Sequence, residues 1–504
     1  MTQVKRPVLR FTLMTIAAHL AFAWASSQYH LDGDTTVSLV QANDWAFTTQ
    51  RDYFWGQQYM GTTEVWLFSS LWRLVFGGRS AIPVQYWIAI GQLLFVAGAA
   101  LTYAGLVFTD RAFWSRARVL AVSVVVLGFT VPVFQKFSFG VGQGYSSTPL
   151  YAGLTAYLYL RRDSIPWPLW VVAGFVLGQS HYIFRLHLIY PVALGAATLA
   201  AGPRAGATRI AGLLAGTIAG MMPEKLLRPP QGYSLSVCAA SVHHVAANAY
   251  QVVSQLSVQA VTVPDSLFES EHALWFNLHR PLPAAWSSVG LAAGAALVLV
   301  LVALQVWRDR TSPRYRIFSM IFAVNLAIVI VSCIPLDPYA ARRYLYPSAL
   351  PVAFFMLNGP WTMPQRIALA VRTLGFAVYV VSAVSFTTPL AAFSAASVPA
   401  GFDARQDCVV GSGGALTVLM AFDNQRFRTV DLNWRLQNNY SRNVAPADAR
   451  DRCRQLFWVN VGNVPARRIE PLCRPDPPYF VGSPHGVVTY PQVVSFSRCL
   501  PARE

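Results

Sequence analysis

The stretch Ile82-Pro-Val-Gln-Tyr-Trp-Ile-Ala-Ile-Gly-Gln-Leu-Leu-Phe-Val-Ala-Gly-Ala-Ala-Leu-Thr-Tyr-Ala-Gly-Leu-Val-Phe108 contains no charged residue. A helix that crosses a bilayer needs about 20 consecutive, mainly apolar residues. Only a helix can satisfy the backbone polar groups of such a segment inside lipid. The stretch therefore predicts a transmembrane helix.

The composition of the whole chain agrees with this prediction. Of the 504 residues, 54% are hydrophobic and 12% are charged, whereas soluble domains carry about 25% charged residues. The net charge of +17 does not indicate nucleic-acid binding, because the basic residues lie in short loops between apolar runs. In that position they are typical of membrane topology signals.

Windows of the same kind recur along the chain and predict an all-α polytopic membrane protein with about eleven transmembrane helices. The predicted spans are Val8–Ser27, Ile82–Phe108, Val119–Phe134, Thr148–Leu160, Trp167–Leu177, Ile183–Ala201, Ile210–Met222, Ala285–Trp307, Ile317–Pro335, Leu345–Leu357 and Ile367–Leu390. The first span follows Lys5, Arg6 and Arg10 and lacks a clear small-x-small cleavage site before a long polar loop. Many further spans follow it, which favours an uncleaved helix over a signal peptide.

The basic residues predict the orientation of these spans. With the N-terminus in the cytoplasm, every second loop is basic, as the positive-inside rule requires. An odd number of spans leaves the C-terminus outside the cytoplasm. The arginines of the cytoplasmic loops are Arg111, Arg116, Arg118, Arg161, Arg162, Arg204, Arg209, Arg308, Arg310, Arg314, Arg316 and Arg366.

Two domains are predicted. Residues 1–399 form the transmembrane core, with long outside loops at about 28–81 and 223–284. Residues 400–504 form a small extracytoplasmic α/β or β-rich domain, whose candidate strands are Leu416–Phe422 and Gly486–Ser497. Four cysteines in this domain predict two disulfides, and their three possible pairings stay open. These cysteines are Cys408, Cys453, Cys473 and Cys499.

Carboxylates in the first outside loop are the candidate catalytic residues. Asp32 and Asp34 follow the first span and precede an amphipathic stretch with Val37, Leu39 and Val40, which predicts a helix lying along the membrane surface. The alternative for Asp34 is a helix N-cap. Glu64 lies in an otherwise apolar run, where a carboxylate beside a membrane is a functional candidate. Its alternative role is to interact with a helix dipole in the first turn.

These residues resemble the bacterial glycosyltransferase RgtA/B/C/D-like family of the GT-C superfamily, which also includes protein O-mannosyltransferases and aminoarabinose transferases. The shared features are acids after the first helix, Gly56-Gln-Gln-Tyr-Met-Gly61 followed by Glu64, and Arg343-Tyr-Leu-Tyr-Pro347 late in the chain. The resemblance covers roughly residues 1–390. Related enzymes often have adjacent Asp-Glu, whereas Asp34 here is followed by Thr35.

The resemblance implies a GT-C-like fold in a bacterial inner (cytoplasmic) membrane, with the C-terminus periplasmic or extracellular. It also implies transfer of a sugar from a polyprenyl-phosphate donor to an envelope glycan, lipid or protein hydroxyl outside the cytoplasm. Asp34, or Asp32 in its place, would be the general base. Arg343, then Arg342, would bind the donor phosphate beside Tyr344. Glu64 would orient the acceptor. A divalent cation (Mg²⁺ or Mn²⁺) at Asp34 and Glu64 stays open.

Further substrate-binding candidates lie in Gln179-Ser-His-Tyr-Ile-Phe-Arg-Leu-His187. His181 and Arg185 are four residues apart and are therefore expected on one helix face. Their alternative role is a buried pair that bridges helices.

Two other functions fit the same composition. A transporter or lipid flippase for envelope glycan precursors would carry charges at mid-membrane and inverted repeats. A non-catalytic assembly protein would act through its C-terminal domain. The position of the candidate acids and arginines at the outer interface favours the transferase over the transporter, and the assembly protein stays open.

Overall fold

The structure is a computed structural model, and it describes part of the chain. The described residues are 8–17, 20, 33–44, 53–54, 57–61, 63–77, 81–109, 146–183, 185–226, 312–331, 347, 403–411, 416, 420, 428–431, 442–459, 474–475 and 496–500. The predicted spans Val119–Phe134, Ala285–Trp307 and Ile367–Leu390 lie outside them, as do the loop 223–284 beyond Leu226 and all of Leu345–Leu357 except Pro347.

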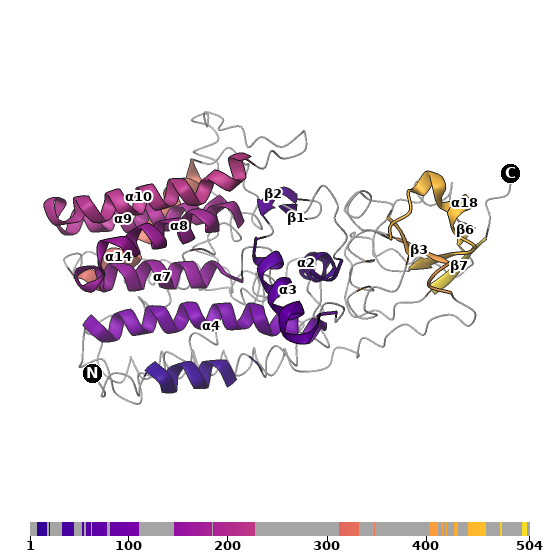
Figure 1. The fold of residues 1–504 in the computed structure, drawn as a ribbon, viewed down its shortest axis with the longest axis horizontal. Coiled ribbons are helices and arrows are strands. Elements are labelled where there is room, and N and C mark those ends of the chain that lie inside the picture. The colour runs from indigo at the N-terminus through magenta and orange to yellow at the C-terminus, as the bar shows by residue number, and fades with distance from the viewer. Residues whose placement is uncertain are drawn as a thin grey trace, which may run out of the picture.

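Long helices run side by side and form a bundle (Figure 1). Helix α4 packs along α7, α8 along α10, and α9 against α10, α7 and α14. The first helix joins the bundle through Phe11, whose ring stacks on that of Tyr103 at a centroid distance of 4.3 Å. The helices are Val8–Ala17, α4 (Val84–Thr109), α7 (Thr148–Leu160), α8 (Trp167–Ile183), α9 (Ile189–Ala201), α10 (Pro203–Leu226) and α14 (Pro313–Ile330).

One helix in the described part of the chain, Val84–Val107, is long and apolar enough to cross a membrane. Three shorter apolar helices accompany it, at Val8–Ala17, Leu186–Ala201 and Arg316–Ile330. The bundle also exposes large apolar side chains. On α8 and α10 these are Trp167, Leu169, Val172, Phe175, Val176, Leu214, Ile218 and Met222.

The helix ends follow local sequence signals. Helix α7 has the bounds of the predicted span, with Pro149 in its first turn, where the missing N–H costs nothing. The predicted span Ile183–Ala201 is instead divided into a short 3-10 helix η3 (Arg185–Leu188) and α9. Pro191 explains this division, because its ring would clash with the carbonyl group of His187 in a continuous α-helix.

Glycines allow the closest contacts between helices. Gly98 of α4 faces Pro149 and Gly153 of α7, and an added Cβ at Gly98 would overlap the Pro149 carbonyl oxygen. Gly174 and Gly178 of α8 meet Leu213, Thr217 and Gly220 of α10 in the same manner. Small residues spaced four apart let helix backbones approach closely, as in membrane helix pairs.

Gly98→Ala is therefore expected to lower the stability of the bundle by about 1–3 kcal/mol, because two backbones must separate. The measurement is the thermal midpoint of the purified protein, followed by size-exclusion fluorescence. Gly195→Ala is the matched control, since a Cβ there meets only a Leu213 methyl at 3.9 Å. Equal midpoints for the two variants would contradict the packing argument.

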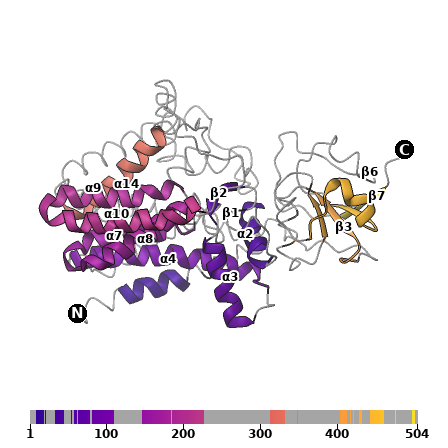
Figure 2. The same ribbon diagram turned by 45° about the horizontal axis from the view of Figure 1, so that its top comes forward.

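A small subdomain covers one end of the bundle. It consists of α2 (Gly33–Asn43), the antiparallel strands β1 (Tyr53–Phe54) and β2 (Gln57–Gly61), and α3 (Thr63–Phe76). In both views it lies between the helices and the C-terminal sheet (Figures 1 and 2). Its contacts run from α2 to α3 and α4, and from β2 to α8.

The stretch after Asp34 is helical, but the prediction that it is amphipathic is wrong, because both of its faces are buried. In α2 not only Val37, Leu39 and Val40 but also Thr36 and Ser38 are fully buried. Polar side chains of α2 form hydrogen bonds with α4 and with the segment that precedes α4. Trp87 Nε1 donates to Ser38 Oγ at 3.0 Å, and the Asn43 amide bonds to the Ile82 N–H at 2.8 Å and to its carbonyl oxygen at 3.1 Å.

The C-terminal region contains a five-stranded mixed sheet in the order β4-β3-β5-β7-β6. β3 pairs in parallel with both β4 and β5, and β7 runs antiparallel to β5 and β6. The strands are β3 (Cys408–Gly411), β4 (Arg428–Asp431), β5 (Leu456–Val459), β6 (Arg474–Pro475) and β7 (Phe496–Leu500).

The two strand predictions for this region have different outcomes. Leu416 and Met420, in the predicted strand Leu416–Phe422, are helical and fully buried. The reason is topological, because parallel neighbours such as β3 and β4 require a crossover connection, usually a helix. Of the run Gly486–Ser497, Phe496 and Ser497 belong to β7 and the rest lies outside the described residues.

One disulfide and one buried ion pair hold the sheet to its flanking segments. Cys408, the first residue of β3, is bonded to Cys453, with a Cα–Cα distance of 5.6 Å. Cys499 is in β7, and Cys473 is not among the described residues. Asp407 is fully buried and accepts hydrogen bonds from Arg454 Nε at 2.9 Å and Nη2 at 2.8 Å.

These bonds from Arg454 hold the pKa of Asp407 below its ordinary value. The pair therefore contributes stability in full above the unfolded-state pKa of about 3.9, and this is lost as the pH falls through the lower folded-state pKa. We expect Asp407→Asn to lower the thermal midpoint of this region by several degrees at pH 7. The difference from the native protein should shrink below about pH 4; a constant difference would contradict the assignment.

Candidate functional site

A buried carboxylate of the small subdomain meets the bundle. Glu64 lies in the first turn of α3 and is 5% exposed. The hydroxyl group of Tyr151, on α7, donates a hydrogen bond to Glu64 Oε1 at 3.3 Å. The short β1–β2 pair, which contains Gln57–Gly61, directly precedes α3 and so delivers Glu64 to this position. The carboxylate is therefore held at the junction between subdomain and bundle.

A histidine lies next to this junction. His187 of η3 is fully buried, and its ring is 5.0 Å from that of Tyr151. Nδ1 is 3.0 Å from the carbonyl oxygen of Ser180, and Nε2 is 2.7 Å from Thr148 Oγ1. Because a carbonyl only accepts, Nδ1 carries the hydrogen, and in the neutral imidazole Nε2 accepts from the Thr148 hydroxyl group. The ring is thus fixed in one tautomer between α7 and α8.

A tyrosine extends the network to the end of the late Arg-Tyr-Leu-Tyr-Pro sequence. Tyr190, in the first turn of α9, is fully buried and its ring is 5.5 Å from that of His187. Its hydroxyl group lies 3.0 Å from the carbonyl oxygen of Pro347 and 3.2 Å from that of Thr148. Segments that are 157 residues apart in the sequence therefore meet at one side chain.

The contacts define a buried polar network, which we call the junction network: Glu64, Tyr151, Thr148, His187, Ser180, Tyr190 and Pro347. It joins the small subdomain to the ends of α7, α8 and α9 that lie nearest to it. Polar groups in a low-dielectric interior are costly unless each has a partner, so such a network specifies one arrangement of its elements. Here it connects Glu64 of the small subdomain to Pro347 by way of Tyr151, His187 and Tyr190.

Of the predicted catalytic residues, Asp34 is the second residue of α2. The helix begins at Gly33, so Asp34 lies within the first turn, where a negative charge is favoured by the helix dipole. Helix α2 packs against α3, which carries Glu64. Asp32, Arg342, Arg343 and Tyr344 lie outside the described residues.

The prediction that His181 and Arg185 share one helix face is wrong. His181 is half-buried in the last turn of α8, which ends at Ile183, whereas Arg185 begins η3. The four-residue spacing therefore spans a break between two helices.

No group of three or more His, Cys, Asp or Glu side chains that could hold a metal ion occurs among the residues the structure describes. Glu64 is a candidate ligand by residue type, since carboxylates suit Mg²⁺ and Mn²⁺. In this site its Oε1 atom accepts a hydrogen bond from the Tyr151 hydroxyl group.

The sequence alone does not predict most of the junction network. Thr148, Tyr151 and Tyr190 lie in predicted apolar spans, and His187 ends the stretch that contains His181 and Arg185. A signal is present, since Thr148 and Tyr151 are three apart at the start of α7 and therefore lie on one helix face. The further partners of Thr148, Tyr151 and Tyr190, however, come from three other segments: α3, η3 and the segment of Pro347.

Comparison of the chain with protein-family models, with curated proteins and with solved structures returned no match. The site is therefore interpreted from its own residues and from the sequence resemblance described above.

Proposed function

We propose that the protein is a membrane glycosyltransferase that moves a sugar from a polyprenyl-phosphate donor to an envelope hydroxyl on the extracytoplasmic side. The observation that carries this proposal is the junction network. The two sequence elements on which the resemblance rests are far apart in the chain, yet Glu64 and Pro347 belong to the same network. Two distant segments are expected to meet in this way if they form one active site, whereas two loops with unrelated roles need not meet.

The surface around the network supports a membrane setting. Helix α3 buries Glu64, Val65 and Ser69 and exposes Trp66, Leu67, Leu71, Leu74, Val75 and Phe76. A helix with a large exposed apolar face at the end of an apolar bundle fits a position in the membrane interface. There, a lipid-linked donor would place its prenyl chain in lipid and its phosphate next to the subdomain.

The proposed chemistry is one displacement at the anomeric carbon. The acceptor oxygen forms a bond to that carbon while the bond to the donor phosphate oxygen breaks, and the phosphate leaves with the electron pair. The carboxylate of Asp34, or of Asp32, takes the acceptor proton. Arg343, supported by Arg342, pairs with the charge of the departing phosphate through its planar guanidinium fork.

Within this proposal the junction network has a positioning role. Glu64 accepts from Tyr151 and so ties α3, and through it α2 with Asp34, to the bundle. Tyr190 ties the bundle to Pro347, four residues after Arg343. Base and phosphate partner would then be held at a constant separation, which matters because misplacement by about 1 Å can cost a hundredfold in rate.

The proposal is tested by mass spectrometry of envelope glycans from a strain that lacks this chain, with and without complementation by the native chain. We expect one sugar substituent to be missing in the deletion strain and restored by complementation. Identical glycans in the two strains would contradict the transferase, and transport of a glycan precursor would then be the function to test.

Tyr151→Phe is expected to lower transfer by about a hundredfold, because it removes the hydrogen bond that ties Glu64 and α3 to the bundle. Glu64→Gln is the matched variant, because it keeps an acceptor for the Tyr151 hydroxyl group and replaces a charged acceptor by a neutral one. We expect it to cost less, about tenfold. Transfer rates per mole of folded protein measure both, and an unchanged rate for Tyr151→Phe would contradict the positioning role.

A further inference from the structure

A cavity of about 510 Å³ opens at one end of the C-terminal sheet. All of its lining residues follow the junction network in the sequence. Four of its seven lining residues are arginines: Arg405, Arg428, Arg442 and Arg452, together with Ala404, Asn443 and Val444. They come from different segments, namely the turn before β3, the first residue of β4, the segment after β4, and the end of α18 (Ala449–Arg452). The cavity therefore lies at the amino ends of the three parallel strands.

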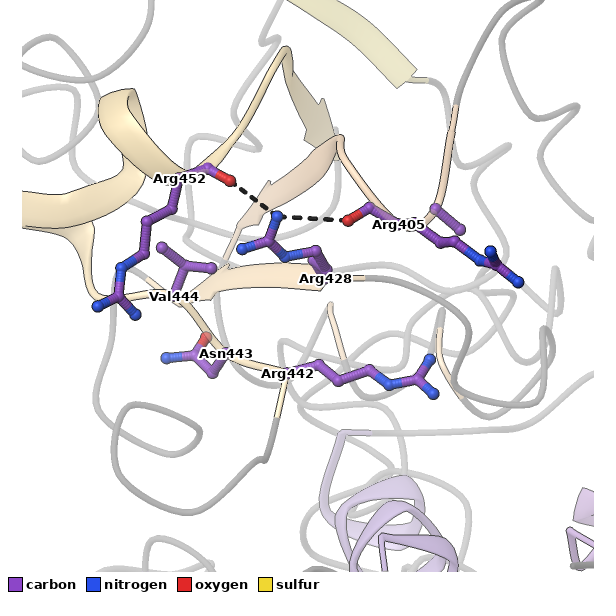
Figure 3. A pocket seen from close by; sticks show the side chains of 7 residues that line it. Arg405, Arg428, Arg442, Asn443, Val444 and Arg452 are labelled. Carbon is purple, nitrogen blue, oxygen red and sulfur yellow. Dashed lines mark hydrogen bonds between the residues drawn. The ribbon is translucent and has the colours of Figure 1, made fainter.

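Arg428 forms the centre of this arginine pocket. Its Nη1 donates to the carbonyl oxygen of Arg452 at 2.7 Å and to that of Arg405 at 3.4 Å. One guanidinium group thus holds two neighbouring segments together (Figure 3). In the same view the side chains of Arg405 and Arg442 extend to one side of Arg428 and that of Arg452 to the other.

None of the seven residues that line the cavity is a carboxylate. Asp448 lies 3.8 Å from Arg452 Nε, a contact between exposed side chains. Asp403 accepts from the backbone N–H of Arg405, and Asp407 is occupied by Arg454, which does not line the cavity. The Cys408–Cys453 disulfide joins the two segments that Arg428 contacts. Cys453 directly follows Arg452, and Cys408 lies three residues after Arg405.

The size and charge of the pocket indicate the chemical class of its ligand. A phosphate monoester carries about two negative charges and three acceptor oxygens, and guanidinium groups pair with such oxygens in bidentate fashion. Two linked phosphates would therefore match four guanidinium groups within one compact cavity. A carboxylate carries only one negative charge. Four carboxylates spaced along a glycan would therefore extend beyond the cavity.

We propose that the arginine pocket binds a pyrophosphate group, either free or at the head of a polyprenyl lipid. The site is separate from the proposed transfer site and does not depend on the proposed function. It would give the C-terminal domain a binding role of its own on the outer face.

The test is binding of labelled inorganic pyrophosphate and of farnesyl pyrophosphate to the full-length protein in detergent, by equilibrium dialysis at low salt. The variant Arg405→Gln/Arg442→Gln removes two exposed charges and leaves the Arg428 contacts in place. We expect saturable binding by the native protein and roughly tenfold weaker binding by this variant, since exposed charge pairs contribute modestly. Equal affinity for the two probes would identify a site for free pyrophosphate. Tighter binding of farnesyl pyrophosphate would identify a site for lipid-linked pyrophosphate.

The control is Arg10→Gln/Arg316→Gln, which removes two positive charges from the helical bundle and none from the pocket. Its affinity should equal that of the native protein. The proposal would be overturned if neither probe binds saturably. It would also be overturned if the pocket variant binds as tightly as the native protein, or if the control variant loses as much affinity as the pocket variant. Stronger binding of polygalacturonate than of pyrophosphate would also overturn it, in favour of a carboxylate site.

Discussion

Replacing Asp34 with Asn should lower sugar transfer by a factor of roughly 10²–10⁴, the range for loss of a positioned general base. Asn has the same size as Asp and can accept a hydrogen bond from a helix N-terminus, so the first turn of α2 should persist. Only the ability to take a proton is lost. If Asp34 served merely to interact with the helix dipole, the same change would affect stability by less than about 1 kcal/mol and leave the rate unchanged.

The measurement is restoration of the missing glycan substituent in the deletion strain by each variant, at equal membrane levels. Asp32→Asn tests the alternative base, and Asp44→Asn is the control. Asp44 directly follows α2, and its backbone N–H bonds to the carbonyl oxygen of Val40 at 2.7 Å, which Asn preserves. Full restoration by Asp34→Asn together with failure of Asp32→Asn would transfer the catalytic role to Asp32. Full restoration by both would remove the acids of this loop from the mechanism.

The double variant Cys408→Ser/Cys453→Ser should lower the free energy of unfolding of the C-terminal domain by about 4 kcal/mol. The chain-entropy model predicts this value for a disulfide that closes a loop of 45 residues. A loss of this size corresponds to a fall of roughly 15–30 °C in the midpoint of a domain of about 100 residues. The loop contains β4 and the segment with Arg442, so both should open more readily without it.

Hydrogen exchange of peptides from β3, β4 and β5 in the full-length protein measures this effect locally. We expect faster exchange in the double variant and unchanged exchange in α4 and α7. Native protein kept in reductant should behave like the variant, and the variant should not respond to reductant in these peptides. Native-like protection of β4 in the variant would show that strand packing alone holds this segment.

Part of the junction network could be anticipated and part could not. The sequence placed a carboxylate, Glu64, beside the membrane and a proline-ended motif at Pro347, because both interrupt apolar runs. It gave no indication that Tyr151 and Tyr190 connect them. These tyrosines occur in runs where an aromatic residue is equally expected in a core or at a lipid interface.

Two predictions failed because they were made from neighbouring residues alone. Helix α2 was predicted to be amphipathic, with Val37, Leu39 and Val40 on one side. Trp87 and the backbone of Ile82 supply partners for its polar face, so both faces are buried. The pair His181 and Arg185 was expected on one helix face from spacing alone, whereas α8 ends at Ile183 and Arg185 begins η3.

What the sequence by itself determined is local: where uncharged runs are long enough to form helices, as for α4 and α7, and which residue types interrupt them. Hydropathy and the restrictions of proline act over neighbouring residues, so they can be assigned without knowing the fold. Only the tertiary structure decided the order of the C-terminal strands, the choice of Cys453 as the partner of Cys408, and the meeting of Tyr190 with Pro347. Each depends on contacts between residues far apart in the chain, and these form only when buried polar and apolar groups find partners together during packing.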